Sequence, residues 1–128
     1  MSALAILLVE DNLLNRRLVR DLLEHHGHHV VDASTVDEAW AALQAETFDI
    51  GLLDVQIPGG GGTRLVERVR ATPLLARLPL VAVTAFAMDG DRERLLAQGF
   101  DGYVSKPIDT RTFVALIASF VSKQGVPT

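Results

Sequence analysis

Short runs of apolar residues recur along the chain at intervals that suit buried strands. Within each run the apolar positions are consecutive rather than alternating, which is typical of strands in a parallel sheet covered on both faces. The runs are Leu4–Val9, Val30–Val31, Ile50–Leu53, Leu80–Val83 and Gly102–Val104. We therefore expect five strands, and the second and fifth runs carry the weakest signal.

Between these runs, apolar residues repeat at the spacing of a helix. The repeating positions are Leu18, Val19, Leu22 and Leu23; Val36, Ala39, Trp40 and Leu43; Leu65, Val66 and Val69; Leu95 and Leu96; and Phe113, Leu116, Ile117 and Phe120. Gly27 and Gly99 are placed to end the first and fourth helices, and the third stops before Pro73. Asp109 or Thr110 is expected to cap the fifth helix.

Strict alternation of five strands and five helices predicts an α/β fold: a doubly wound, five-stranded parallel sheet with helices on both faces. Right-handed crossovers place the carboxyl end of every strand at one edge of this sheet. We expect one domain over residues 1–124 and a frayed tail over 125–128.

Composition narrows the possible functions. The chain has 128 residues, a net charge of −4 and no cysteine, so disulfide and thiol chemistry are excluded. No basic stripe suggests nucleic-acid binding, and no apolar stretch approaches the roughly 20 residues that span a bilayer. A cytoplasmic monomer is expected.

Chemically active residues follow four of the five strands. Glu10 and Asp11 follow the first, Asp54 the third, Thr84 ends the fourth, and Lys106 follows the fifth. Ligands of open α/β sheets bind beyond the carboxyl ends of the strands, so these side chains are expected to converge. Clustered carboxylates repel one another unless a cation is present, and oxygen ligands favour Mg²⁺. A carboxylate there can act as a nucleophile toward phosphorus.

Four segments resemble the signature of two-component response-regulator receiver domains. They are Val9-Glu10-Asp11-Asn12, the run 53–58 (Leu-Asp-Val-Gln-Ile-Pro), Val83-Thr84-Ala85 and Lys106-Pro107. The likeness covers essentially the whole chain and is greatest to single-domain receivers of cell division. It implies the flavodoxin-like or CheY-like (βα)5 fold with strand order 2-1-3-4-5.

The resemblance also implies the chemistry of the site. A sensor histidine kinase or histidine phosphotransfer protein would transfer a phosphoryl group from phosphohistidine to Asp54. Mg²⁺ would be held by Asp11, Asp54 and the Gln56 carbonyl, with Glu10 nearby or acting through water. Lys106 and the Thr84 hydroxyl would contact the phosphoryl group.

Signalling is implied to run through Thr84 and Tyr103, whose coupled shifts would change the surface formed by the fourth helix, fifth strand and fifth helix. A downstream protein would read that surface. The inward face of the first helix has limited room for both Leu13 and Leu14, so at least one is expected to be exposed near the site. It would contact the phosphodonor there; partial burial against a loop is the alternative.

Several residues flank the expected acceptor. Gln56 cannot act as a carboxylate base and Phe86, next to Ala85, can screen the phosphoryl group, so slow dephosphorylation is expected. Pro107 restricts the backbone of Lys106 and can aim its side chain. The glycine run Gly59–Gly62 departs from the family pattern and is expected to form a mobile loop. The histidines between positions 25 and 29 are expected to form a solvated cluster.

Two alternatives remain for the function. One is a degenerate receiver that binds proteins without being phosphorylated, and the other is a receiver cut from a hybrid histidine kinase. An aspartyl-phosphate hydrolase is disfavoured because Gln56 stands where that mechanism needs a second carboxylate. We therefore expect a signalling module that promotes only its own phosphorylation and dephosphorylation, rather than an enzyme.

Overall fold

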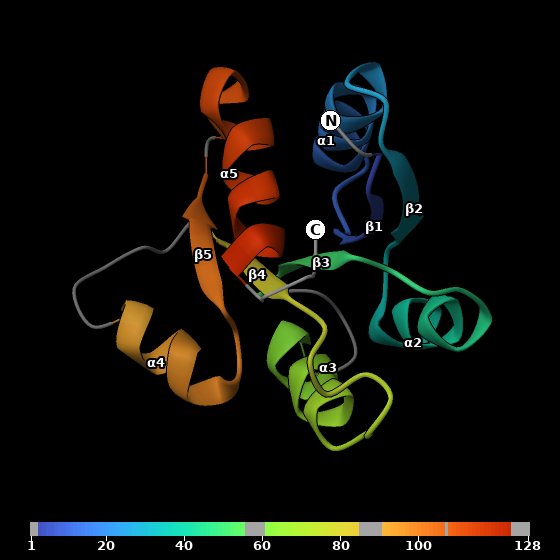
Figure 1. The fold of residues 1–128 in the computed structure, drawn as a ribbon, viewed down its shortest axis with the longest axis vertical. Coiled ribbons are helices and arrows are strands. Elements are labelled where there is room, and N and C mark those ends of the chain that lie inside the picture. The colour runs from blue at the N-terminus through green and yellow to red at the C-terminus, as the bar shows by residue number, and fades with distance from the viewer. Residues whose placement is uncertain (1–2, 56–60, 85–90, 107, 124–128) are drawn as a thin grey trace.

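A computed structural model describes residues 3–55, 61–84, 91–106 and 108–123. Strands and helices alternate along these residues as predicted (Figure 1). In chain order they are β1 (Ala5–Val9), α1 (Leu13–His25), β2 (His29–Ala33), α2 (Val36–Ala45), β3 (Ile50–Asp54), α3 (Gly61–Arg70), β4 (Leu80–Thr84), α4 (Asp91–Gln98), β5 (Gly102–Ser105) and α5 (Thr110–Lys123). The expected tail, 125–128, lies outside the described residues.

The strands form one parallel sheet in the order β2-β1-β3-β4-β5, which confirms the predicted fold. Every residue of the central strands β3 and β4 is buried, whereas the edge strands β2 and β5 include half-buried positions. The continuous apolar runs and the weaker second and fifth signals follow from this arrangement, because an edge strand has a neighbour on only one side.

Helices cover both faces of the sheet, and alternate residues of β1 point into the two layers. Ile6 and Leu8 pack with buried residues of α1 and α5. Leu7 and Val9 pack with buried residues of α2, α3 and α4 on the opposite face. Figure 1 shows α1 and α5 on one side of the sheet and α2 and α3 on the other. Within the described ranges, every helix is too short or too polar to cross a lipid bilayer.

Local caps set the helix ends. The Asn12 side chain accepts a hydrogen bond from the Asn15 backbone N–H at 3.0 Å and begins α1. Asp109, rather than Thr110, caps α5, because its Oδ1 atom accepts the N–H of Arg111 at 3.0 Å. Gly99 has a φ of 115° immediately after α4, as the expected ending requires.

The rotation of α1 differs from the prediction. Val19 and Leu23 are buried and Leu22 is half-buried, but Leu18 is 54% exposed although it was expected to point inward. Adjacent helix positions are about 100° apart, so Leu18 and Val19 cannot both face the centre of the sheet. Packing against the sheet selects Val19 and leaves Leu18 on the flank of the helix.

Half of the expected glycine loop is helical, which corrects the prediction. Gly61 and Gly62 form the start of α3, while Gly59 and Gly60 lie outside the described residues. Gly61 has a φ of 74°, and a Cβ atom there would lie 2.7 Å from the Val55 carbonyl oxygen. A Cβ atom on Gly62 would lie 3.0 Å from the Asp54 carbonyl oxygen. These two glycines therefore let α3 begin close against the end of β3.

The histidine cluster also differs from the prediction at one position. His28 is buried, and its Nδ1 atom accepts the Leu4 backbone N–H at 3.0 Å, whereas His25, His26 and His29 are exposed. Burial, with a smaller contribution from the nearby His26 charge, lowers the pKa of His28. His28 therefore acts as a neutral structural acceptor at the start of the sheet.

Candidate functional site

The structure brings together the carboxylates that follow β1 and end β3. Glu10, Asp11 and Asp54 each offer an oxygen, and these oxygens all lie within 4.8 Å of one another. Glu10 and Asp54 are buried, whereas Asp11 is exposed at the mouth of the site. The predicted convergence at the carboxyl edge of the sheet is therefore observed for all three groups.

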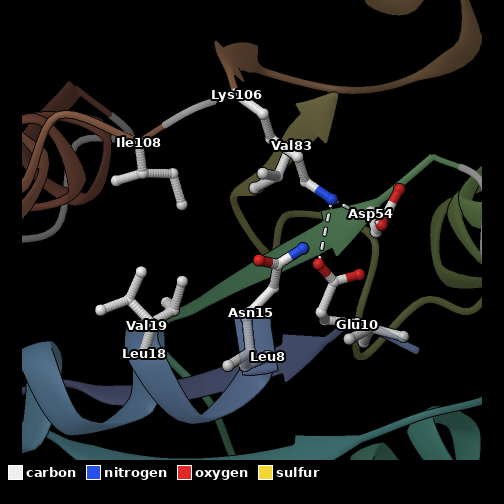
Figure 2. A pocket seen from close by; sticks show the side chains of 10 residues that line it. Leu8, Glu10, Asn15, Leu18, Val19, Asp54, Val83, Lys106 and Ile108 are labelled. Atoms are coloured by element: carbon white, nitrogen blue, oxygen red, sulfur yellow. Dashed lines mark hydrogen bonds and ion pairs between the residues drawn. The ribbon is translucent and has the colours of Figure 1, made fainter. Parts of the chain in front are cut away.

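Lys106 reaches this cluster from the end of β5. Its Nζ atom lies 2.9 Å from Glu10 Oε1 and 2.9 Å from Asp54 Oδ2, and Figure 2 shows both contacts. Its backbone N–H donates to the Thr84 carbonyl at 2.8 Å, which holds the start of the side chain beside β4. Because three carboxylates face one ammonium, a divalent cation would balance the site.

Burial controls the protonation of Glu10. Its side chain is only 5% exposed, and burial raises its pKa to about 7. The nearby carboxylate of Asp54 adds to this rise, while the ammonium of Lys106 acts in the opposite direction. Burial also lowers the pKa of Lys106, but its hydrogen bonds to Asp54 and Glu10 outweigh that effect and raise it overall. Lys106 therefore stays protonated at neutral pH.

One buried oxygen at the site lacks a partner within the described part of the chain. Glu10 Oε2 accepts no hydrogen bond there, which is costly for a carboxylate oxygen. An unsatisfied oxygen within a group of three carboxylates fits a small, hard cation that takes oxygen ligands. The residues present therefore suit Mg²⁺.

An apolar cavity of about 410 Å³ adjoins the carboxylates. Glu10, Asp54 and Lys106 form its polar end (Figure 2). Its remaining lining consists of Leu8, Val9, Asn15, Leu18, Val19, Val83 and Ile108. The sequence patterns did not predict that Asn15, Leu18 and Ile108 line this cavity. An apolar residue two positions after Lys106 was the available signal for Ile108.

The remaining predicted residues have different positions. Thr84 is buried at the end of β4, and Tyr103 is half-buried in β5, where it packs against the core beneath α2, α3 and α4. Leu13 and Leu14 are 54% and 77% exposed at the start of α1. The predicted positions Gln56, Ala85, Phe86 and Pro107 lie outside the described residues.

Comparisons with known proteins cover almost the whole chain. The model of the response regulator receiver domain family matches residues 6–118. The polar-differentiation response regulator DivK of Brucella ovis is 36% identical over 117 residues, which are 91% of this chain and 95% of that protein. The expected likeness to cell-division receivers is thereby confirmed.

Solved structures agree in fold. The receiver domain of a sensor histidine kinase from Pseudomonas aeruginosa, which has a magnesium ion coordinated in its active site cleft, is 28% identical. It has a TM-score of 0.85 over 94% of this chain and 99% of its own. The chemotaxis response regulator CheY4 of Vibrio cholerae is 25% identical, with a TM-score of 0.87 over 93% of this chain and 99% of its own.

Proposed function

Because this chain belongs to the response regulator receiver domain family, we propose that it accepts a phosphoryl group on Asp54 and signals through a change of its surface. The observation that supports this proposal most directly is the contact of Lys106 Nζ with both Asp54 and Glu10 at 2.9 Å, beside the carboxylate of Asp11. An arrangement of one ammonium and three carboxylates suits transfer of an anionic group in the presence of a divalent cation.

Mg²⁺ is the cofactor in this proposal. Asp11 and Asp54 are its ligands, and Glu10 binds it directly or through water; the Gln56 carbonyl completes the expected set. The unsatisfied Glu10 Oε2 supports this assignment. When bound, Mg²⁺ neutralises charge on the carboxylates and on the incoming phosphoryl oxygens.

Asp54 is the nucleophile. A carboxylate oxygen of Asp54 attacks the phosphorus of a phosphohistidine, the P–O bond forms, and the electron pair of the P–N bond returns to the imidazole. Lys106, held 2.9 Å from Asp54 Oδ2, then donates to a phosphoryl oxygen. The hydroxyl of Thr84, at the end of the neighbouring strand β4, donates to another.

The signal leaves the site through Thr84 and Tyr103. These residues lie on the paired strands β4 and β5, where Tyr103 is opposite Ala82 and Thr84 is opposite Ser105. Movement of Thr84 toward the phosphoryl group frees space that Tyr103 fills, and the surface of α4, β5 and α5 changes. A downstream protein binds that surface.

The phosphodonor is a sensor histidine kinase or a histidine phosphotransfer protein. The surface of this chain on which the phosphodonor docks includes Leu13 and Leu14, because both are exposed at the end of α1 nearest the acceptor carboxylates. The chain changes only its own phosphorylation state and turns over no separate substrate. Slow dephosphorylation is expected from Gln56 and Phe86.

Intact-mass spectrometry with Mg²⁺ and acetyl phosphate tests the proposal. The wild-type chain should gain one phosphoryl group and Asp54→Asn none, while the control Asp37→Asn, an exposed carboxylate on α2, should behave as wild type. If neither acetyl phosphate nor a phosphorylated histidine phosphotransfer protein modifies a folded, Mg²⁺-binding chain, the phosphorylation-independent binding module replaces this proposal.

A further inference from the structure

Arg70 ends α3 and uses all five N–H donors of its guanidinium. Nε and Nη2 donate to the Gly99 carbonyl at 2.9 and 2.7 Å. Nη1 donates to the carbonyls of Ala76 and Leu78 at 2.9 and 2.7 Å. Nη2 also donates to Asp101 Oδ2 at 3.0 Å. One side chain therefore joins α3, the segment before β4 and the turn between α4 and β5.

Asp101 links Arg70 to the first residue of β4. Its Oδ2 atom accepts the Leu80 N–H at 2.7 Å, and its own N–H donates to the Leu80 carbonyl at 2.8 Å. These two bonds fix the first pairing between β4 and β5. Arg70 restrains the carboxylate that makes one of them, so it restrains where β5 begins against β4.

The placement of β5 matters for the acceptor site. β5 has four residues and, among the described strands, pairs with β4 alone; Lys106 follows it directly. A slip of one residue in such a strand turns each side chain to the opposite face. Lys106 can make its contacts with Asp54 and Glu10 only in the observed register. By contrast, the carboxylates follow or end β1 and β3, which have neighbours on both sides.

The turn after α4 is shaped to present its carbonyl to Arg70. Gly99 has a φ of 115°, and a Cβ atom there would lie 2.7 Å from Val66 Cγ1 and 3.3 Å from Arg70 Cγ. The glycine thus packs against the aliphatic part of Arg70 while two nitrogens of the same residue bind its carbonyl. A lysine ammonium cannot reproduce this planar, forked contact.

We propose that Arg70 is a positioning residue that sets the register of β5 and thereby places Lys106 against Asp54. The catalytic part of this inference rests on the proposed function, but the structural part does not. It separates two properties of the site: β1 and β3 place the carboxylates that would bind Mg²⁺, whereas the contacts of Lys106 depend on β5 and hence on Arg70.

Lysine-selective NMR tests the structural part in unphosphorylated, Mg²⁺-free protein. The chain has two lysines, Lys106 and Lys123, so each variant gives a simple spectrum. In Arg70→Gln the side-chain signal of Lys106 should move while that of Lys123 stays. The control Arg77→Ala removes an exposed arginine from the segment between α3 and β4 and should move neither signal. An unmoved Lys106 signal in folded Arg70→Gln overturns the proposal.

Kinetics test the catalytic part, at a temperature at which thermal unfolding shows each variant to be folded. Arg70→Gln and Arg70→Lys should accept phosphoryl groups from acetyl phosphate about tenfold more slowly or worse, with Mg²⁺ affinity no lower than that of the wild type. Asp101→Asn should act similarly, and combining it with Arg70→Gln should add little. A wild-type rate with only a lower Tm would make Arg70 merely structural and overturn the proposal.

These outcomes remain distinct from failure of the proposed function. If the wild-type chain takes no phosphoryl group on Asp54, the proposed function fails, and the Lys106 NMR signal still decides whether Arg70 positions β5. A joint loss of Mg²⁺ affinity and rate in Arg70→Lys would show general disruption of the site and would count against the proposal.

Discussion

Lys106 Nζ lies 2.9 Å from Asp54 Oδ2, although Lys106 follows β5, Asp54 ends β3, and β4 lies between these two strands. The lysine side chain therefore reaches across β4 to the central strand β3. It neutralises a carboxylate that stands close to two others, and its charge repels any cation bound there. This contact affects both the reactivity of the site and its affinity for metal.

Replacing Lys106 with methionine should separate these two effects. Lys106→Met should phosphorylate more slowly by about a hundredfold, because one donor to the developing phosphoryl charge is lost. It should bind Mg²⁺ more tightly, since a competing positive charge is removed. Mass spectrometry of phosphorylation and calorimetric titration of Mg²⁺ check this, with Lys123→Met as control. An unchanged rate would remove Lys106 from the mechanism.

Glu10 should make stability depend on pH in the absence of Mg²⁺. Its pKa is raised from 4.5 to about 7 in the folded protein, so the folded state binds the proton more tightly than the unfolded chain. The resulting stabilisation is complete below about pH 4.5 and is lost as the pH rises through about 7. The free energy of unfolding of Glu10→Gln, relative to that of the wild type, should therefore rise by about 1–3 kcal/mol from pH 5 to pH 8.

Chemical denaturation of both chains at each pH measures this difference. The lowered pKa of His28 favours stability at higher pH, but it affects both chains equally and cancels from the comparison. Protons should also compete with Mg²⁺ at Glu10, so wild-type Mg²⁺ affinity should rise from pH 6 to pH 8, and that of Glu10→Gln should rise less. A constant stability difference across this range would contradict the assignment.

Leu14 should affect the rate of phosphoryl transfer from a protein donor but not from a small-molecule donor. Leu14→Glu should reduce phosphoryl transfer from a phosphorylated histidine phosphotransfer protein by about tenfold or more. Its rate with acetyl phosphate should stay at the wild-type value, because Leu14 is exposed on α1 and outside the carboxylate cluster. Leu74→Glu is a matched control, since Leu74 is 97% exposed in the loop after α3. Equal losses in both variants would exclude a docking role for Leu14.

Gly102 should be sensitive to a single methyl group. A Cβ atom there would overlap Cε1 and Cζ of Phe120, so the α5 ring packs directly on the β5 backbone. Gly102→Ala should reduce the free energy of unfolding by about 1–3 kcal/mol through overpacking. The double variant with Phe120→Ala should lose less than the sum of the two single variants. Additive losses in denaturation experiments would contradict this contact.

The sequence by itself determined the elements and most of the acceptor site. Continuous apolar runs predict strands buried on both faces, and parallel strands direct their carboxyl ends to one edge. Glu10, Asp11, Asp54 and Lys106 each follow or end a strand, so their convergence needed only the alternation of strands and helices. The strand order came from the family resemblance, because pairing between distant segments leaves little trace in local patterns.

Tertiary packing decided what the patterns left open. Whether Leu18 or Val19 faces the sheet depends on how α1 rotates against it, and burial of His28 depends on the neighbouring Leu4 N–H. Gly61 and Gly62 form part of a helix because α3 begins against the backbone of Asp54 and Val55. Arg70 gives no local signal, since its hydrogen-bond acceptors extend to Asp101, 31 residues away. The local sequence shows the hydrophobic period of each element and hence whether it is buried. The rotation of a helix, the close approach of two backbones and hydrogen bonds between distant residues are decided only when the elements pack together.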